Sequence, residues 1–182
     1  MHDRMEFRRR YYRRPGELFA DLRALFAARR EVTPVMRGHS LDAAFRERLM
    51  LAVTAVNGCR YCAYGHARMA LAAGVPAEQV HALAEGIVEG CPPHEAPALL
   101  YAQHWAESDG QPTPEAHARI EQLYGAGTAG AIDTALRVIR MGNLLGNTLD
   151  YWLWRLSGGR WGTRVAPHGS IGAQHPTLGG RP

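Results

Sequence analysis

Two cysteines, a histidine and a glutamate lie at a spacing that could support thiol redox chemistry. Cys59 and Cys62 form a Cys-x-x-Cys pair, His66 follows the pair and Glu47 precedes it, in the pattern Glu-x11-Cys-x2-Cys-x3-His. Two thiols this close in the chain can carry two electrons by cycling between a dithiol and a disulfide. The histidine can take a thiol proton, and the carboxylate can hold the histidine in place. The pattern therefore predicts the site of a redox enzyme.

A helix would bring three of these side chains together. Cys59, Cys62 and His66 are spaced i, i+3 and i+7, so they share one helical face. Asn57-Gly58 directly before them marks the start of that helix, which puts both cysteines in its first turn. There the unpaired N–H groups and the positive end of the dipole favour a thiolate. Such a placement can lower a cysteine pKa from about 8.5 toward 7.

Glu47 has two interpretations. Its neighbours one helical turn on, Met50 and Leu51, are apolar, and burial among them would raise the pKa of the carboxyl toward the range useful for proton transfer. Alternatively, Glu47 is a surface residue flanked by Arg46 and Arg48. Periodicity does not choose between the two, but the spacing to the cysteines favours the buried site.

The elements that must position these residues are all helices. Amphipathic spacing, Pro and Gly punctuation and the absence of period-two alternation predict an all-α domain over residues 15–156. It follows a basic arm (1–14) and precedes a Gly- and Pro-rich tail (157–182) that we expect to be flexible. Ser40 is the expected cap of the second helix. The expected helices cover 16–30, 41–56, 59–74, 76–85, 95–108, 114–124 and 128–156.

Composition points to a soluble protein rather than a membrane or nucleic-acid-binding one. Apolar residues make up 46% of the 182, and the longest apolar run, Leu49–Val56, is far shorter than the roughly 20 residues of a membrane span. The net charge is +4, and the chain contains arginine but no lysine. Five of the arginines are clustered at positions 8–14. We interpret this cluster as a solvated arm, with RNA, DNA or acidic lipid as a less favoured partner. The first residues lack a secretory signal pattern, so we expect a cytoplasmic protein with reduced thiols.

The stretch from Arg46 to Ala70, R-E-R-L-M-L-A-V-T-A-V-N-G-C-R-Y-C-A-Y-G-H-A-R-M-A, resembles the alkylhydroperoxidase D (AhpD) family. That family belongs to the carboxymuconolactone decarboxylase superfamily, and all four positions of its motif are present. The resemblance is specific over about residues 41–90 and implies an AhpD-like helical domain of six to seven helices. Asn143 and Asn147 are similar to the family's second half more weakly.

The resemblance also implies roles. Cys62 would be the attacking thiolate on a hydroperoxide, Cys59 would resolve the product into a disulfide, and His66 would relay the proton of Cys62 to Glu47. No bound cofactor or metal is implied. A dihydrolipoyl group on a carrier protein, or another dithiol, would reduce the disulfide, and the protein could serve a peroxiredoxin. A trimer or hexamer is expected.

One position departs from the family. Its best known members have a histidine directly before the second cysteine, where this chain has Tyr61. That histidine helps to protonate the resolving thiol, so either Tyr61 fills the role or the role is dispensable. The departure weakens the expectation of peroxidase turnover more than that of dithiol chemistry.

Three other functions remain open on the sequence. A structural zinc site could use the two cysteines and His66 with a fourth ligand drawn from Glu47, His81, Cys91 and His94, although none has a recognised zinc spacing. A lyase of the carboxymuconolactone decarboxylase type would not need the cysteine pair. A non-enzymatic oligomer could use the pair as a redox sensor. Cys91 is interpreted as a lone loop thiol, and the Gly142/Gly146 pair as a site of close helix packing.

Overall fold

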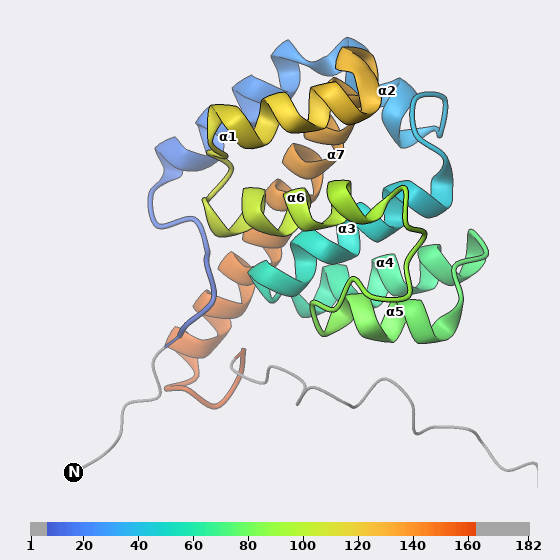
Figure 1. Cartoon of the computed structure of the whole chain (residues 1–182). Helices are drawn as coiled ribbons and strands as arrows, with labels where there is room; N and C mark the ends of the chain where they lie inside the picture. The colour runs from blue at the N-terminus through green and yellow to red at the C-terminus, as the bar shows by residue number, and fades with distance from the viewer. Residues whose placement is uncertain (1–6, 163–182) are drawn as a thin grey trace, which may run out of the picture.

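The described part of the chain is an assembly of helices around one central helix. The computed structural model describes residues 7–162, and these contain seven helices and no strand (Figure 1). The predicted all-α class is confirmed. The first six helices are α1 (Pro15–Ala27), α2 (Arg29–Met36), α3 (Ala43–Asn57), α4 (Arg60–Ala72), α5 (Ala77–Ala84) and α6 (Ala96–Glu107). The expected tail beyond residue 162 lies outside the described residues.

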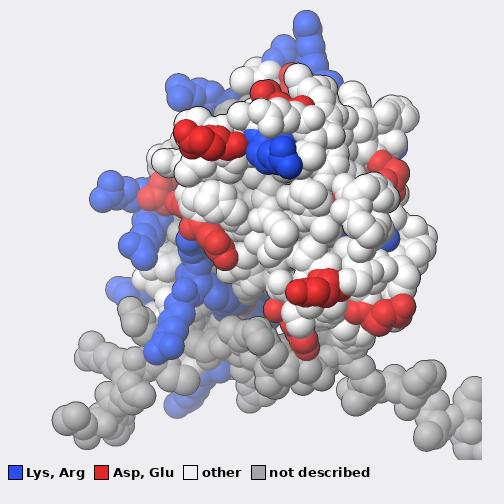
Figure 2. Space-filling model, in the orientation of Figure 1, with Lys and Arg blue, Asp and Glu red and all other residues white. Residues whose placement is uncertain are grey.

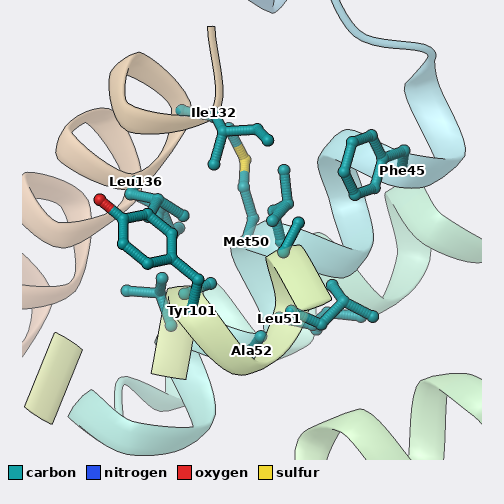
Figure 3. Close-up of a cluster of buried hydrophobic side chains, with 14 of the residues drawn as sticks. Phe45, Met50, Leu51, Ala52, Tyr101, Ile132 and Leu136 are labelled. Carbon is teal, nitrogen blue, oxygen red and sulfur yellow. The ribbon is translucent and has the colours of Figure 1, made fainter. Parts of the chain in front are cut away.

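Helix α3 is the centre of the fold. Five consecutive residues, Leu49–Val53, are almost completely buried, so α3 is covered on all sides rather than along one stripe. It packs against α4, α5, α6 and the last helix. Figure 3 shows Met50 and Leu51 of α3 among side chains from α6 and the last helix, including Tyr101 and Ile132. The core therefore holds α3 rigidly, and with it Glu47 and the entry to α4.

The last helix, α7 (Pro114–Leu156), is long but interrupted. Gly125 has φ 79° and ψ 154°, which breaks the helical path between two segments. The sequence predicted a break here, between helices over 114–124 and 128–156. A residue with a side chain rarely adopts this positive φ, so glycine is what permits the change of direction. The second segment then runs past α3 and α4 to the cysteine site.

Two local predictions were wrong. The connection expected around Pro34 is helix α2, because Val35 is buried and fixes this turn against the core. The first helix correspondingly ends at Ala27 rather than at residue 30. The cap of α3 is Asp42, not Ser40: its Oδ1 accepts hydrogen bonds from the N–H groups of Ala44 and Phe45 at 2.9 and 3.1 Å.

A buried ion pair joins three helices behind the site. Arg48 of α3 donates through Nη1 to both carboxylate oxygens of Glu95 at 3.1 Å, and through Nε to Gln79 of α5. Glu95 directly precedes α6. Both charged side chains are more than nine-tenths buried, so Arg48 does not lie at the surface, as one interpretation of the sequence had it. Removing either partner would leave a buried charge alone, which is strongly destabilising.

Part of the N-terminal segment packs against the fold, although Arg8, Arg10, Arg13 and Arg14 are exposed. Figure 1 shows it running alongside the C-terminal part of α7, and Tyr12 is buried there with its N–H bonded to Thr148 at 3.0 Å. Arg10 donates to the carbonyls of Ala106 and Glu107 at the end of α6. The side chain of Arg9 is 8% exposed. The expectation of a solvated arm is therefore wrong for Arg9, because a buried carboxylate on α7 holds it.

The surface carries mixed charge. On the face drawn in Figure 2, arginine side chains gather on one side, with Asp and Glu among them. None of the described helices is long and apolar enough to span a membrane.

Candidate active site

The cysteine pair lies where α3 ends and α4 begins. Gly58 stops α3 in a left-handed conformation (φ 70°), as the Asn57-Gly58 signal predicted. Cys59 is the N-cap of α4, and its Sγ accepts a hydrogen bond from the N–H of Cys62 at 3.4 Å. Cys59 is fully buried, whereas Cys62 is only partly buried. A small molecule can therefore reach Cys62 more easily than Cys59.

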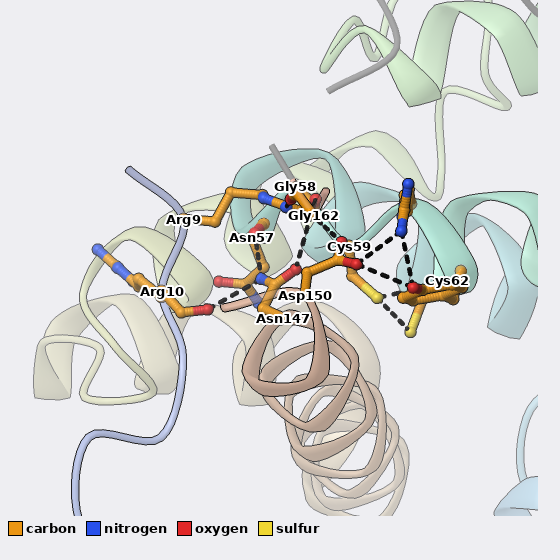
Figure 4. Close-up of polar contacts among 11 residues, drawn as sticks. Arg9, Arg10, Asn57, Gly58, Cys59, Cys62, Asn147, Asp150 and Gly162 are labelled. Carbon is orange, nitrogen blue, oxygen red and sulfur yellow. Dashed lines mark hydrogen bonds and ion pairs between the residues drawn. The ribbon is translucent and has the colours of Figure 1, made fainter. Parts of the chain in front are cut away.

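The two sulfur atoms face each other. They lie 3.0 Å apart, so one thiol can donate a hydrogen bond to the other (Figure 4). Both cysteines are free, and a disulfide would need the sulfurs about 2.05 Å apart. Closing the bond therefore requires a shift of about 1 Å, which side-chain rotation can supply.

The pair shares one proton unequally. The hydrogen bond from the Cys62 thiol lowers the pKa of Cys59 to about 7 despite burial, helped by the N–H groups of Cys62 and Tyr61. The same hydrogen bond, burial and the neighbouring Cys59 charge raise the pKa of Cys62, and the side chain of Asn143 opposes the rise. Of the two thiols, Cys59 is therefore the one whose ionisation this arrangement favours, and Cys62 is the one whose ionisation it disfavours.

Buried Glu47 of α3 pairs with partly buried His66 of α4. Glu47 is 1% exposed, and its Oε2 lies 2.7 Å from Nδ1 of His66. Its Oε1 accepts from Nε and Nη2 of Arg46 at 3.1 and 3.0 Å. The structure thus confirms the buried interpretation of Glu47. His66 lies one turn after Cys62 on α4, so the two share a helical face, and the link between imidazole and sulfur stays a prediction.

The expected rise in the pKa of Glu47 was wrong in sign. Burial does act to raise it, but the hydrogen bonds and charges of His66 and Arg46 outweigh burial, and the pKa is lowered. The apolar neighbours in the sequence suggested a raised pKa, but Arg46, which looked like a surface flank, bonds to the carboxylate and lowers it. Glu47 is therefore a fixed negative charge at neutral pH, suited to hold and orient an imidazole rather than to keep a proton.

Helix α7 closes the site with a polar stripe. Asn143, Asn147 and Asp150 are completely buried. Asn143 donates to Oγ1 of Thr54 at 3.1 Å, and Asn147 donates to the carbonyl of Asn57 at 2.8 Å. The stripe therefore fixes the end of α3, from which the cysteine loop starts. In the sequence, the signals for this stripe were the spacing of its members, about one turn apart, and the weak family resemblance at Asn143 and Asn147.

Two glycines of α7 leave room for the sulfurs. A Cβ atom at Gly146 would lie 2.7 Å from Sγ of Cys59, whereas one at Gly142 would lie 3.9 Å from Sγ of Cys62. The first distance is a clash and the second an ordinary contact. Close helix packing, as predicted for this pair, is therefore what Gly146 provides.

This difference gives a matched prediction. We expect Gly146→Ala to lower the free energy of unfolding by about 2 kcal/mol, because the new methyl group overpacks the site. Gly142→Ala should be neutral or stabilising by up to about 1 kcal/mol, since alanine is the better helix former and space exists. Urea unfolding of the two reduced variants measures both values. Equal effects would contradict the assigned packing.

Two further residues singled out in the sequence, Tyr61 and Cys91, are not part of the Cys59–Cys62 pair. The hydroxyl of Tyr61 donates to Asp150 at 2.8 Å and accepts from Arg60, so it is bonded away from the sulfurs. Cys91 is buried in the turn before Pro92, and burial raises its pKa. Within residues 7–162, no group of three or more His, Cys, Asp and Glu side chains is arranged to hold a metal ion.

Comparison with known proteins finds one family model that is similar to part of the chain. Residues 21–108 match the model of the carboxymuconolactone decarboxylase family, a stretch that includes all four motif residues. No curated protein and no solved structure matches the chain. The match supports the superfamily and does not distinguish the AhpD-like branch from the others.

Proposed function

Starting from this carboxymuconolactone decarboxylase family segment, we propose that the protein is a thiol-dependent peroxidase that reduces alkyl or hydrogen hydroperoxides. The observation that supports it most is the pair of free thiols 3.0 Å apart, one partly exposed and one buried, on the same helix as a histidine that is held by the buried Glu47. Members that act as decarboxylases do not need such a pair. The proposed sites are Cys62, Cys59, His66 and Glu47.

In the first step Cys62 attacks the peroxide. Because the pKa of Cys62 is raised, its proton must be removed as the sulfur attacks, and His66 held by Glu47 is the proposed base. The Cys62 sulfur bonds to the outer peroxide oxygen, the O–O bond breaks, and the leaving alkoxide takes the proton from His66. The products are an alcohol and a sulfenic acid on Cys62.

In the second step Cys59 resolves the sulfenic acid. The Cys59 thiolate attacks the sulfur of Cys62, the S–O bond breaks, and the hydroxide takes one proton from the solvent and leaves as water. An external dithiol then reduces the disulfide and is itself oxidised to a disulfide; of its two protons, one goes to Cys62 and the other to the solvent, which restores the Cys59 thiolate. A dihydrolipoyl group on a carrier protein is the reductant we propose, and a peroxiredoxin is a further proposed partner. A homo-oligomer in the cytoplasm completes this proposal.

A thiol count tests the function. Reduced, metal-free protein receives one equivalent of cumene hydroperoxide, and free thiols are counted before and after. We expect a loss of two thiols out of three, with Cys91 unreacted because it is buried and keeps its proton. Turnover with dihydrolipoamide should follow. A single reaction without turnover would indicate a redox sensor, and no loss would leave a lyase or a disulfide exchanger.

A further inference from the structure

A completely buried carboxylate lies behind the cysteine loop and takes no direct part in the proposed reaction. Asp150 accepts hydrogen bonds at 2.7 Å from Nη1 of Arg9, at 2.7 Å from Nη2 of Arg60 and at 2.8 Å from the hydroxyl of Tyr61. Its side chain is 0% exposed. A buried negative charge beside the cysteine loop opposes a second negative charge there, and Asp150 does act to raise the pKa of Cys59. A positive charge must therefore offset the negative charge of Asp150.

Arg9, from the N-terminal segment, binds Asp150 near the C-terminal end of α7. Figure 4 shows its guanidinium between the cysteine loop and the end of α7. Besides Asp150, Nη1 lies 3.4 Å from both the carbonyl of Gly58 and Oδ1 of Asn147, and Nη2 donates to the carbonyl of Gly162. The methylene carbons of Arg9 lie 3.2 to 3.3 Å from where a Cβ of Gly58 would be. Arg9 thus contacts the residue directly before Cys59.

The two arginines on Asp150 are not equivalent. Arg60 is 38% exposed at its side chain, so solvent screens it, whereas the side chain of Arg9 is 8% exposed. A cation that is shielded from water acts more strongly on a nearby buried charge than an exposed one does. Arg9 is therefore the stronger compensator, and only Arg9 also holds the backbone of the cysteine loop.

We propose that Arg9 is a positioning residue of the dithiol site: it neutralises Asp150 and holds Gly58, so that Cys59 can carry the resting thiolate. The charged and titratable groups that surround Cys59 under this proposal are Cys62 and Arg60 from α4, Asp150 from α7 and Arg9 itself, with Tyr61 bonded to Asp150. The proposal depends on the proposed function only in its use of that thiolate.

The test is a titration of the thiolate by its ultraviolet absorbance in the reduced, full-length protein. The transition at lowest pH belongs to Cys59, because the pKa values of Cys62 and Cys91 are raised. We expect Arg9→Gln to move this midpoint upward by about one pH unit, which lowers the thiolate fraction at pH 7 about fivefold. Arg8→Gln is the matched control: it removes the same charge from the neighbouring, exposed position and should leave the midpoint unchanged.

Two further variants separate charge from folding. Arg9→Lys keeps the positive charge and should restore most of the wild-type midpoint. Arg9→Gln combined with Asp150→Asn removes both charges and should bring the midpoint back to the wild-type value or below it. A midpoint of Arg9→Gln equal to that of Arg8→Gln, or an upward shift that survives loss of the Asp150 charge, would overturn the proposal. Because this titration uses no peroxide, it can succeed even if the thiol count rejects the peroxidase, and the reverse also holds.

Discussion

Replacing Cys62 with serine is expected to abolish peroxide-driven thiol loss. The serine hydroxyl can keep the hydrogen bond to Cys59 but cannot be oxidised by a hydroperoxide. Cys59 is fully buried and Cys91 is buried with a raised pKa, so neither thiol can substitute as the attacking group. Treatment with one equivalent of cumene hydroperoxide should leave the remaining two thiols intact, a loss of at least about 10³-fold in rate. Oxidation at the wild-type rate would show that another residue attacks.

The matched variant is Cys59→Ser, which removes the resolving thiol and leaves the accessible one. Cys62 should then still react with peroxide but stop at the sulfenic acid, because no thiolate lies within reach. Dimedone should trap that acid, and mass analysis should locate the adduct on Cys62. An adduct on Cys59 in the Cys62→Ser protein would reverse the order of the two cysteines. This reversal is worth testing because the pKa of Cys59 is lowered and that of Cys62 is raised.

Glu47→Gln is expected to slow peroxide reduction about 10²-fold. The amide has almost the same shape, but it cannot hold His66 through a charge at 2.7 Å or stabilise the imidazolium that forms when Cys62 loses its proton. Stopped-flow measurement of the first oxidation step gives the rate. Glu89→Gln, at an exposed loop position, removes the same charge and should react like the wild type. Equal rates in the two variants would leave Glu47 a structural residue.

The same variant should change the response of stability to acid. The folded pKa of Glu47 is lowered from its ordinary value of 4.5, so its charge stabilises the fold above that value. This stabilisation is lost as the pH falls below 4.5 through the lower folded pKa. The free energy of unfolding should therefore fall less steeply in this acid range in Glu47→Gln than in the wild type. Urea unfolding at a series of pH values measures the slope.

The local order of the helices could be predicted from the sequence, because it depends on signals close in the chain. Asn57-Gly58, Gly74 and Gly125 mark real ends or breaks, and they act through backbone conformations that hardly depend on distant residues. Helix α2 was missed because Pro34 normally interrupts a helix, and only the burial of Val35 reveals why this turn forms. Tertiary packing decided this element against local propensity.

Some residues of the site could likewise be predicted from local spacing, and others come together only in the folded chain. The motif contained Glu47 and His66, and their spacing was enough to predict a pair. Arg9, by contrast, meets Asp150 across 141 positions, and no periodicity connects the two. In the sequence the arginines near the N-terminus form one cluster, and composition cannot tell which member meets a buried carboxylate. Such long-range charge pairing could have been found only from the fold.

The position of α7 also has a consequence for how the protein folds. The cysteine pair is made by residues in the first half of the chain, but the sulfur of Cys59 is packed against Gly146, Asn147 holds Asn57, and Asp150 holds Arg60 and Tyr61. Contacts over such long sequence separations form late, after the entropy of closing a large loop has been lost. A growing chain would therefore hold both cysteines in an unfinished setting until α7 is complete. The reactivity of the two thiols therefore depends on whether α7 has packed against them.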